Sequence, residues 1–197
     1  FPPLNEAINL DLRAPYFQSF NSAISIFPLY AYALFFDANY YDMSEQHTLN
    51  YGMKDKPMIQ QSMPYLQNLK EPFAAKMILL SNHFPFEMDP GDTDFPAADT
   101  NDKIVNQYFQ TAHYMDEALR QLFDNLKASG LYDHTMIVMY GDHYGISTNH
   151  NQAMQQIMGK EITPYVNAQN QRVPLFITAP HIKGKVVHKY GGEVDVR

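Results

Sequence analysis

Two short segments of the sequence carry side chains that can do chemistry, Asn82–Pro85 (NHFP) and Gly141–Gly145 (GDHYG). The first contributes the imidazole of His83, and the second a carboxylate and an imidazole that are adjacent in sequence. Adjacent side chains point to opposite faces of an extended strand, but a loop flanked by glycines allows both to converge on one ion. A carboxylate and a neutral imidazole suit Mn²⁺, Zn²⁺ or Mg²⁺. Asp142 and His143 are therefore candidate metal ligands that together make half of a metal site.

Each segment also has a purely structural interpretation, in which Asp142 caps a turn, His143 is solvated and His83 is a hydrogen-bonding group in a loop. The preceding residues favour a shared site, because each segment follows an apolar run of strand length, 73–80 (FAAKMILL) or 135–140 (TMIVMY). Sites in open α/β sheets form beyond the carboxyl ends of the strands. If both runs belong to one parallel sheet, we expect His83 to lie close to an ion held by Asp142 and His143.

The elements that must position these residues are visible as apolar patterns. Residues 73–80, 135–140 and 173–178 are apolar enough for strands that are buried on both faces. Residues 102–129 repeat apolar side chains at the helical period, and Gly130 follows where a left-handed cap ends a helix. A strand, a long helix and a strand make a parallel crossover. The sequence thus predicts an α/β fold with a mostly parallel sheet flanked by helices.

Shorter elements are predicted between these. Residues 62–70 have the spacing of a helix that ends before Pro72, while 37–61 and 87–101 are rich in polar and turn-forming residues and are predicted as loops. Residues 14–36 carry no charge, but Pro28 and several polar side chains interrupt the apolar run. We therefore expect buried strand or helix pieces there, not a membrane span.

Composition excludes several classes of protein. Lys and Arg number 14 and Asp and Glu 21, and the resulting net charge of −7 argues against a nucleic-acid-binding protein. The absence of cysteine excludes disulfides, thiolate nucleophiles and zinc–thiolate sites. A length of 197 residues suits one domain or most of one. Because no signal peptide follows Phe1 and the chain stops just after a Gly-Gly turn, we expect a piece of a larger protein that is truncated at both ends.

Four runs carry a resemblance to a known family: NHFPF (82–86), the helix-like run 105–133, IVMYGDHYGIS (137–147) and YGGEVDVR (190–197). Together they resemble the extracellular catalytic domain of the lipoteichoic acid synthase family, within the alkaline phosphatase and sulfatase superfamily, from about residue 35 to 197. The resemblance implies a membrane-anchored parent protein on the outer face of a bacterial cell membrane, or a product secreted after cleavage. Residues 1–197 would then be the C-terminal portion of one sulfatase-like domain, with 1–34 matching poorly.

The resemblance also implies an activity and the residues that carry it. Glycerol phosphate would move from phosphatidylglycerol to a growing polyglycerolphosphate chain through a covalent intermediate on a threonine. Asp142 and His143 correspond to two metal ligands, and His83 to a histidine that binds the glycerol phosphate. The implied ion is Mn²⁺, with Mg²⁺ or Zn²⁺ as alternatives, and membrane contact would come from segments outside this chain.

The threonine nucleophile and a glutamate ligand of the family are expected upstream of Phe1, so this chain alone is expected to be inactive. An ungapped match places Ala14, Asn21 and Ala23 where the family has a substrate-holding His, Trp and Arg. Two other functions stay open: a sulfatase or phosphodiesterase of the same superfamily, and a degenerate or truncated domain without catalysis. The remaining histidines, His150 among them, are expected to have no functional role.

Overall fold

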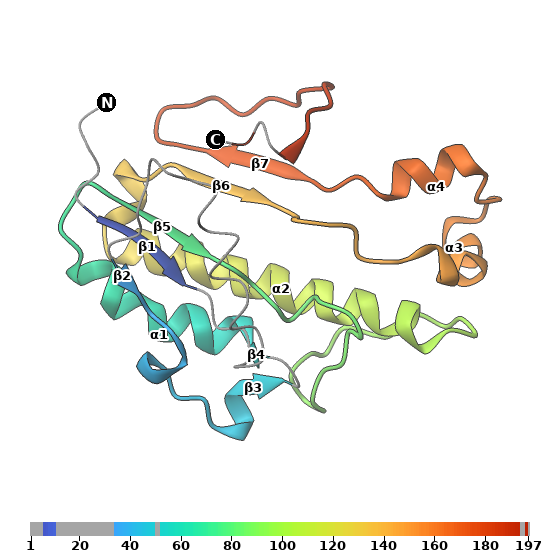
Figure 1. Ribbon diagram of the computed structural model, residues 1–197, viewed down its shortest axis with the longest axis horizontal. Coiled ribbons are helices and arrows are strands. Elements are labelled where there is room, and N and C mark those ends of the chain that lie inside the picture. Colours follow the sequence, from blue (N-terminus) through green and yellow to red (C-terminus); the bar gives the residue numbers. More distant parts are fainter. Residues whose placement is uncertain (1–5, 11–33, 50–51, 194–195, 197) are drawn as a thin grey trace.

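The computed structural model describes residues 6–10, 34–49, 52–193 and 196 (Figure 1). The predicted buried pieces within 14–36, and Ala14, Asn21 and Ala23, lie outside the described residues or at their very edge. Strand β1 (Glu6–Leu10) pairs in parallel with β2 (Leu34–Phe35) on one side and with β5 (Phe73–Met77) on the other. The predicted parallel sheet is therefore present, with the strand order β2-β1-β5.

Two further strand pairs are antiparallel. Strands β3 (Thr48–Leu49) and β4 (Gly52–Met53) form a short pair, and β6 (Ile137–Tyr140) pairs with β7 (Leu175–Thr178). The expectation that the apolar runs 73–80 and 135–140 join one hydrogen-bonded parallel sheet was wrong for the described residues, because β5 and β6 belong to separate sheets. Apolar content marks a strand, but it does not identify the strand's hydrogen-bonding neighbour.

Helices α1 (Asp55–Asn68) and α2 (Lys103–Ala128) run beneath the strands in Figure 1, and the shorter α3 (Asn151–Met158) and α4 (Pro164–Asn170) follow β6. The prediction for α2 is confirmed at both ends. Asp102 caps its first turn through its side chain, and Gly130 adopts the left-handed conformation with φ +80°. Single 3₁₀ turns occupy Ala38–Tyr40, Glu45–His47, Leu131–His134 and Thr148–His150.

Helix α1 begins seven residues earlier than predicted, so the expectation of a loop through residue 61 was wrong. Pro57 suggested a break, but it lies in the first turn of the helix, where the missing N–H has no partner to lose. Pro64 lies within the helix. The helix then ends at Asn68, close to the predicted end before Pro72.

One apolar cluster brings the starts of β5 and β6 together. It consists of Met63 and Leu66 of α1 with Leu126 and Leu131, and the partly buried Phe73 and Ile137 pack against it. Because Phe73 begins β5 and Ile137 begins β6, both strands start at the same apolar cluster. In Figure 1 they run alongside one another in the same direction. Their carboxyl ends therefore lie at the same edge of the molecule, although the strands are not hydrogen-bonded to each other.

The last strand is less buried than its apolar sequence predicts. Leu175, Phe176 and Ile177 of β7 are 50–57% exposed, and Val138 of β6 is 42% exposed. The expectation of burial on both faces was wrong here because β6 and β7 form a two-stranded ribbon with Ile137 facing the helices. It was also wrong for β5, in which Ala74, Ala75 and Lys76 are exposed. Among the described residues, no helix combines the length and the apolar character that crossing a membrane requires.

Candidate active site

The loop that carries His83 is anchored by hydrogen bonds to a buried carboxylate, that of Asp55. Asp55, at the start of α1 and 0% exposed, accepts hydrogen bonds through Oδ1 from the backbone N–H groups of Leu80 (2.8 Å) and Ser81 (3.1 Å). The N–H of Asp55 in turn donates to the hydroxyl of Ser81 (2.9 Å). Burial raises the pKa of the Asp55 carboxyl, and these hydrogen bonds oppose that rise. The direction in which the chain leaves β5 is thus set by α1.

Two further contacts fix the loop after Ser81. Thr111 of α2, which is fully buried, donates its hydroxyl hydrogen to Oδ1 of Asn82 (2.8 Å). Phe86 is 1% exposed and packs edge-on against the ring of Tyr108, with ring centroids 5.1 Å apart. Phe86 has a φ of +62°, a region that costs a non-glycine residue about 1–3 kcal/mol, and burial of its ring contributes a stabilisation of similar size. The apolar anchor of NHFPF is therefore Phe86, while His83 and Phe84 remain exposed.

The Gly141–Gly145 loop follows β6, and its glycines serve a different purpose from the one expected. Neither lies in the left-handed region; both are sites of close approach. A Cβ on Gly141 would lie 3.0 Å from Cβ of Val173, and one on Gly145 would lie 2.8 Å from Cε2 of Tyr108. The N–H of Gly141 also donates to the carbonyl oxygen of Pro174 (3.3 Å). The loop is held by tight packing against neighbouring residues.

The two loops bring His83 and His143 together, as the sequence led us to expect. Their ring centroids are 5.5 Å apart, and the rings are almost perpendicular. In each ring Nδ1 lies 2.8 Å from the carbonyl oxygen of the following residue, Phe84 or Tyr144. Because a carbonyl oxygen only accepts hydrogen bonds, Nδ1 carries the proton, and in the neutral ring the lone pair is at Nε2. Both imidazoles therefore have the tautomer in which Nε2 can act as a metal ligand, whereas a contact with a phosphate oxygen requires a proton on Nε2 as well.

Asp142 and His143 fit a divalent cation by geometry. Nε2 of His143 lies 3.7 Å from Oδ1 of Asp142, which is less than twice the metal–ligand distance of about 2.1 Å, so both atoms can bind one ion. Both side chains are more than half exposed, at 55% and 73%. Within the part of the chain that the structure describes, no group of three or more His, Asp or Glu side chains is arranged to hold a metal. The two residues thus fit half of a metal site, and their role as ligands stays a prediction.

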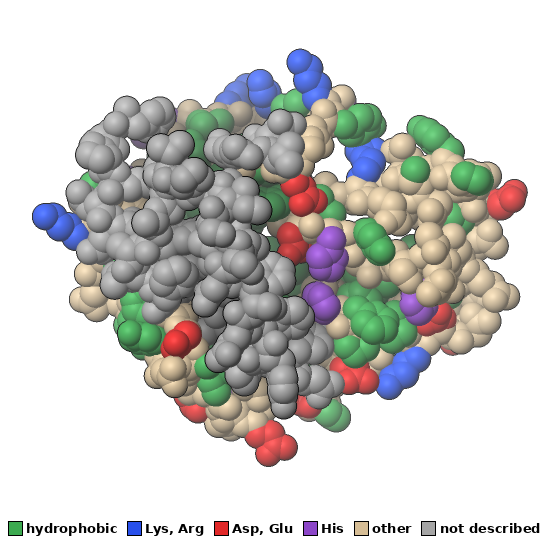
Figure 2. All heavy atoms as spheres, viewed as in Figure 1, with side chains coloured by type: hydrophobic (Ala, Val, Ile, Leu, Met, Phe, Trp, Pro, Cys, Tyr) green, Lys and Arg blue, Asp and Glu red, His purple; other side chains and the backbone are tan. Residues whose placement is uncertain are grey.

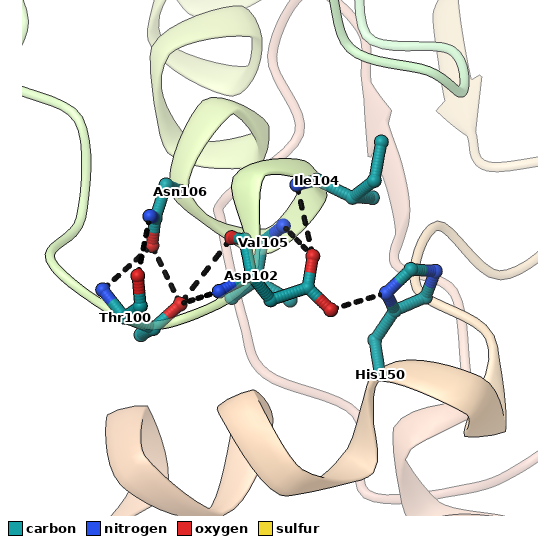
Figure 3. A network of polar contacts seen from close by, with 6 residues as sticks. All are labelled: Thr100, Asp102, Ile104, Val105, Asn106 and His150. Carbon is teal, nitrogen blue, oxygen red and sulfur yellow. Dashed lines mark hydrogen bonds and ion pairs between the residues drawn. The ribbon is translucent and has the colours of Figure 1, made fainter.

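Sequence reasoning missed a third histidine at the same place. A groove with a volume of about 450 Å³ is lined by His83 and His143 and also by His150, which we expected to have no role. Nδ1 of His150 lies 2.6 Å from Oδ2 of Asp102, whose Oδ1 caps α2 (Figure 3). Burial by itself raises the pKa of Asp102, but the contact with His150 and the backbone N–H groups hold it below its usual range. The available sequence signal pointed to Asp102 only as the cap of the long helix and not to its pairing with His150.

The groove has apolar walls as well as three histidines. Phe84, Phe86, Ile104 and Tyr144 contribute to its walls beside the three histidines. On the face drawn in Figure 2, histidine side chains lie next to acidic ones and to a group of hydrophobic side chains. Such a groove suits a small anionic group attached to an apolar or polyol chain.

Comparison with known proteins identifies the group to which this arrangement belongs. The profile of the family described as Sulfatase matches residues 11–196, which is nearly the whole chain. The chain belongs to the sulfatase family. Among solved structures, this sulfatase-family chain is similar to the lipoteichoic acid synthase LtaP from Listeria monocytogenes, with a TM-score of 0.71 and 21% identity over 91% of this chain and 44% of that one. A protein in the alkaline phosphatase superfamily from Vibrio parahaemolyticus gives a TM-score of 0.61 and 18% identity, covering 91% of this chain and 39% of that one. The predicted sulfatase-like α/β fold is therefore confirmed.

Curated relatives of this sulfatase-family chain are more similar in sequence. It is 63% identical over 163 residues to lipoteichoic acid synthase 2 of Bacillus subtilis, covering 82% of this chain and 25% of that protein. Lipoteichoic acid synthase 1 of the same organism is 54% identical over 180 residues, covering 91% of this chain and 28% of that protein. Lipoteichoic acid synthase of Staphylococcus aureus is 44% identical over 162 residues, covering 82% of this chain and 25% of that protein. The chain thus spans about a quarter of the length of these relatives, and the resemblance inferred from its motifs is confirmed.

The close approach at Gly145 gives a testable prediction. In Gly145→Ala the new methyl group would displace the ring of Tyr108, which packs against Phe86, so we expect the free energy of unfolding to fall by about 1–3 kcal/mol. Urea denaturation measures this change. Gly184→Ala is the matched control, because a Cβ at Gly184 meets open space and should change stability by less than about 0.5 kcal/mol. Equal stability of both variants would show that the loop tolerates a side chain at Gly145.

Proposed function

We propose that this chain is part of a phosphoglycerol transferase of lipoteichoic acid synthesis. The observation that carries the proposal is the high sequence identity to lipoteichoic acid synthases over most of the chain. In the proposed reaction, glycerol phosphate is transferred from phosphatidylglycerol to the end of a polyglycerolphosphate chain. Phosphatidylglycerol and that polymer are the proposed partners, and the outer face of a bacterial cell membrane is the proposed location.

The exposed side chains of the two loops suit this chemistry. In the proposal, Oδ1 of Asp142 and Nε2 of His143 hold a divalent cation, with Mn²⁺ as the proposed ion. When bound, such a cation offsets negative charge on phosphoryl oxygens and lowers the pKa of an oxygen nucleophile. The ring of His83 lies close to that of His143 and, in its doubly protonated form, would donate a hydrogen bond from Nε2 to the phosphate group.

We further propose that residues 1–197 form the C-terminal portion of one larger catalytic domain. Two observations on the described residues support this: they supply only part of a metal-ligand set, and the apolar side chains of β7 are exposed. The rest of a larger domain would complete the ligand set and cover β7. The nucleophile, a threonine, is proposed to lie in that other portion. It would form and then lose a phosphodiester bond to glycerol, with diacylglycerol as the first product and the polymer's terminal hydroxyl as the acceptor.

The test is turnover of phosphatidylglycerol by the full-length protein that contains this chain. We expect Mn²⁺-dependent release of diacylglycerol, and a trapped intermediate that carries one glycerol phosphate on a threonine, detected by mass spectrometry. The 197-residue chain assayed alone should release no diacylglycerol.

The family whose profile matches the chain is described as Sulfatase, and this favours one alternative function, that of a sulfatase. Hydrolysis of an aryl sulfate without any release of diacylglycerol would support that alternative and overturn the transferase proposal. Turnover by the isolated 197-residue chain would instead show that this part of the protein already holds a complete site.

A further inference from the structure

We propose that His150, held in place by Asp102, is a third histidine of the site and donates a hydrogen bond from Nε2 to an anionic oxygen of a phosphate ester in the groove. The inference deepens the proposed function and rests on it for the class of ligand, a phosphate ester. His150 would be the residue that touches the ligand, and Asp102 the residue that positions it. Neither was expected from sequence to have such a role.

The first support is the rigidity of the pair. Oδ1 of Asp102 accepts from the N–H groups of Ile104 (2.9 Å) and Val105 (3.4 Å), and its own N–H donates to Thr100 Oγ1 (3.1 Å). Thr100 is tied in turn to Asn106 of α2 through its hydroxyl (2.6 Å) and its carbonyl (2.9 Å). Figure 3 shows the carboxylate fixed between the helix and the imidazole. A carboxylate anchored at so many points holds the ring of His150 in one orientation.

The second support is the direction of the ring. Because the carboxylate of Asp102 only accepts, Nδ1 of His150 carries the proton of the 2.6 Å contact, and Nε2 points away from Asp102 (Figure 3). In the proposal, the ring takes up a second proton, at Nε2, when the phosphate ester binds, and the carboxylate of Asp102 and the anionic ligand balance the added charge. The other ionisable side chains that line the same groove are His83, His143 and Tyr144. With Nε2–H as its second donor, His150 offers a phosphate oxygen a charge-assisted hydrogen bond.

The third support is that a local structural role does not account for the pair. His150 is the residue before α3, yet its side chain makes no capping hydrogen bond to that helix. Asp102 caps α2 through Oδ1 alone, and its second oxygen, Oδ2, accepts a hydrogen bond from His150, which lies 48 residues further along the chain. The His150 side chain is only 18% exposed and lines a groove that two other histidines also line. A partly buried pair that spans two elements and borders a groove of this composition is typical of a ligand site.

The chain provides a matched control for this pair. His134 lies 3.0 Å from the carboxylate of Glu71, so it is also a histidine–carboxylate pair between distant segments. It lies just after the far end of α2, in the Leu131–His134 turn, and does not line the groove. The variants for the test are therefore His150→Gln, Asp102→Asn and His134→Gln.

Binding is measured by calorimetry and by NMR of the imidazole Cε1–H signals in the full 197-residue chain. The probes are inorganic phosphate, glycerol phosphate as a monoester, and glycerophosphoglycerol as a diester like the polymer. We expect His150→Gln to weaken binding of glycerol phosphate about tenfold and Asp102→Asn about threefold, with His134→Gln unchanged. The Cε1–H signal of His150 should shift on addition of glycerol phosphate, a readout that a merely structural role would not move.

The three probes separate the two sources of the phosphate group. A loss of affinity for the monoester alone assigns His150 to the transferred glycerol phosphate, and an equal loss for the diester assigns it to the polymer or the lipid donor. Affinities of His150→Gln within twofold of the wild type for all three probes, together with an unmoved His150 signal, would overturn the inference. The same variants in the full-length protein distinguish a failure of this inference from a failure of the proposed function. Probe binding that depends on His150, without any release of diacylglycerol, would support this inference and contradict the transferase proposal.

Discussion

Replacing Asp142 with Asn should lower the rate of glycerol-phosphate transfer by the full-length protein on the order of 10³-fold. The substitution keeps the size of the side chain but exchanges an anionic ligand for a neutral amide 3.7 Å from Nε2 of His143. A cation bound there would then lose roughly 4 kcal/mol of interaction free energy with its site, which corresponds to the expected 10³-fold loss of rate. Because the Asp142 side chain is 73% exposed, stability should change by less than about 0.5 kcal/mol.

The measurement is release of diacylglycerol from phosphatidylglycerol at a series of Mn²⁺ concentrations, with calorimetric titration of Mn²⁺ in parallel. Asp124→Asn is the control, since Asp124 is an exposed aspartate on α2 that forms an ion pair with Arg120 on the same helix. The variant at Asp142 should bind Mn²⁺ more weakly while the control matches the wild type. Full activity with unchanged Mn²⁺ affinity would show that Asp142 is a solvated turn residue and not a ligand.

Replacing Asp55 with Ala should lower the free energy of unfolding by about 2–4 kcal/mol, a larger loss than any other single substitution considered for this chain. The change removes the acceptor of two backbone N–H groups, those of Leu80 and Ser81, at a position that is 0% exposed. Those donors would be left buried without their partner, and the loop that carries His83 would lose its support. Urea denaturation measures the stability, and an exposed helical aspartate, Asp116→Ala, serves as the control.

The same residue predicts a dependence of stability on pH. Burial raises the pKa of the Asp55 carboxyl above its unfolded value of about 3.9, so the folded chain binds this proton more tightly than the unfolded chain does. The contribution of Asp55 to stability is therefore fully present below about pH 4 and is lost as the pH rises through its folded pKa. In Asp55→Asn this contribution is absent at every pH. The stability advantage of the wild type over Asp55→Asn, measured as the difference in unfolding free energy, should thus shrink as the pH rises above about 4. A constant difference would contradict the raised pKa of Asp55.

Much of the site follows from local sequence because local rules govern its parts. Helix α2 begins after Asp102 and ends before Gly130 at the residues where its apolar period starts and stops, since a cap and a left-handed glycine act within a few residues. His83 and His143 meet because each follows a strand, and both strands start on one apolar cluster. The resemblance carried by the NHFPF and GDHYG motifs led to the family that the comparisons confirm.

Only the tertiary structure decided which distant residues serve those motifs. Asp55 lies 25 residues before Leu80 and His150 lies 48 residues after Asp102, and no periodicity or spacing marks either pair. The pairing of β6 with β7 and not with β5 likewise depends on long-range contacts, because an apolar run indicates a strand but neither its hydrogen-bonding neighbour nor how deeply it is buried. From sequence, the glycines of GDHYG suggest conformational freedom of the backbone, whereas in the fold Val173 packs closely against Gly141 and Tyr108 against Gly145. Sequence alone determined which groups could do chemistry, and packing between distant segments determined how they are held.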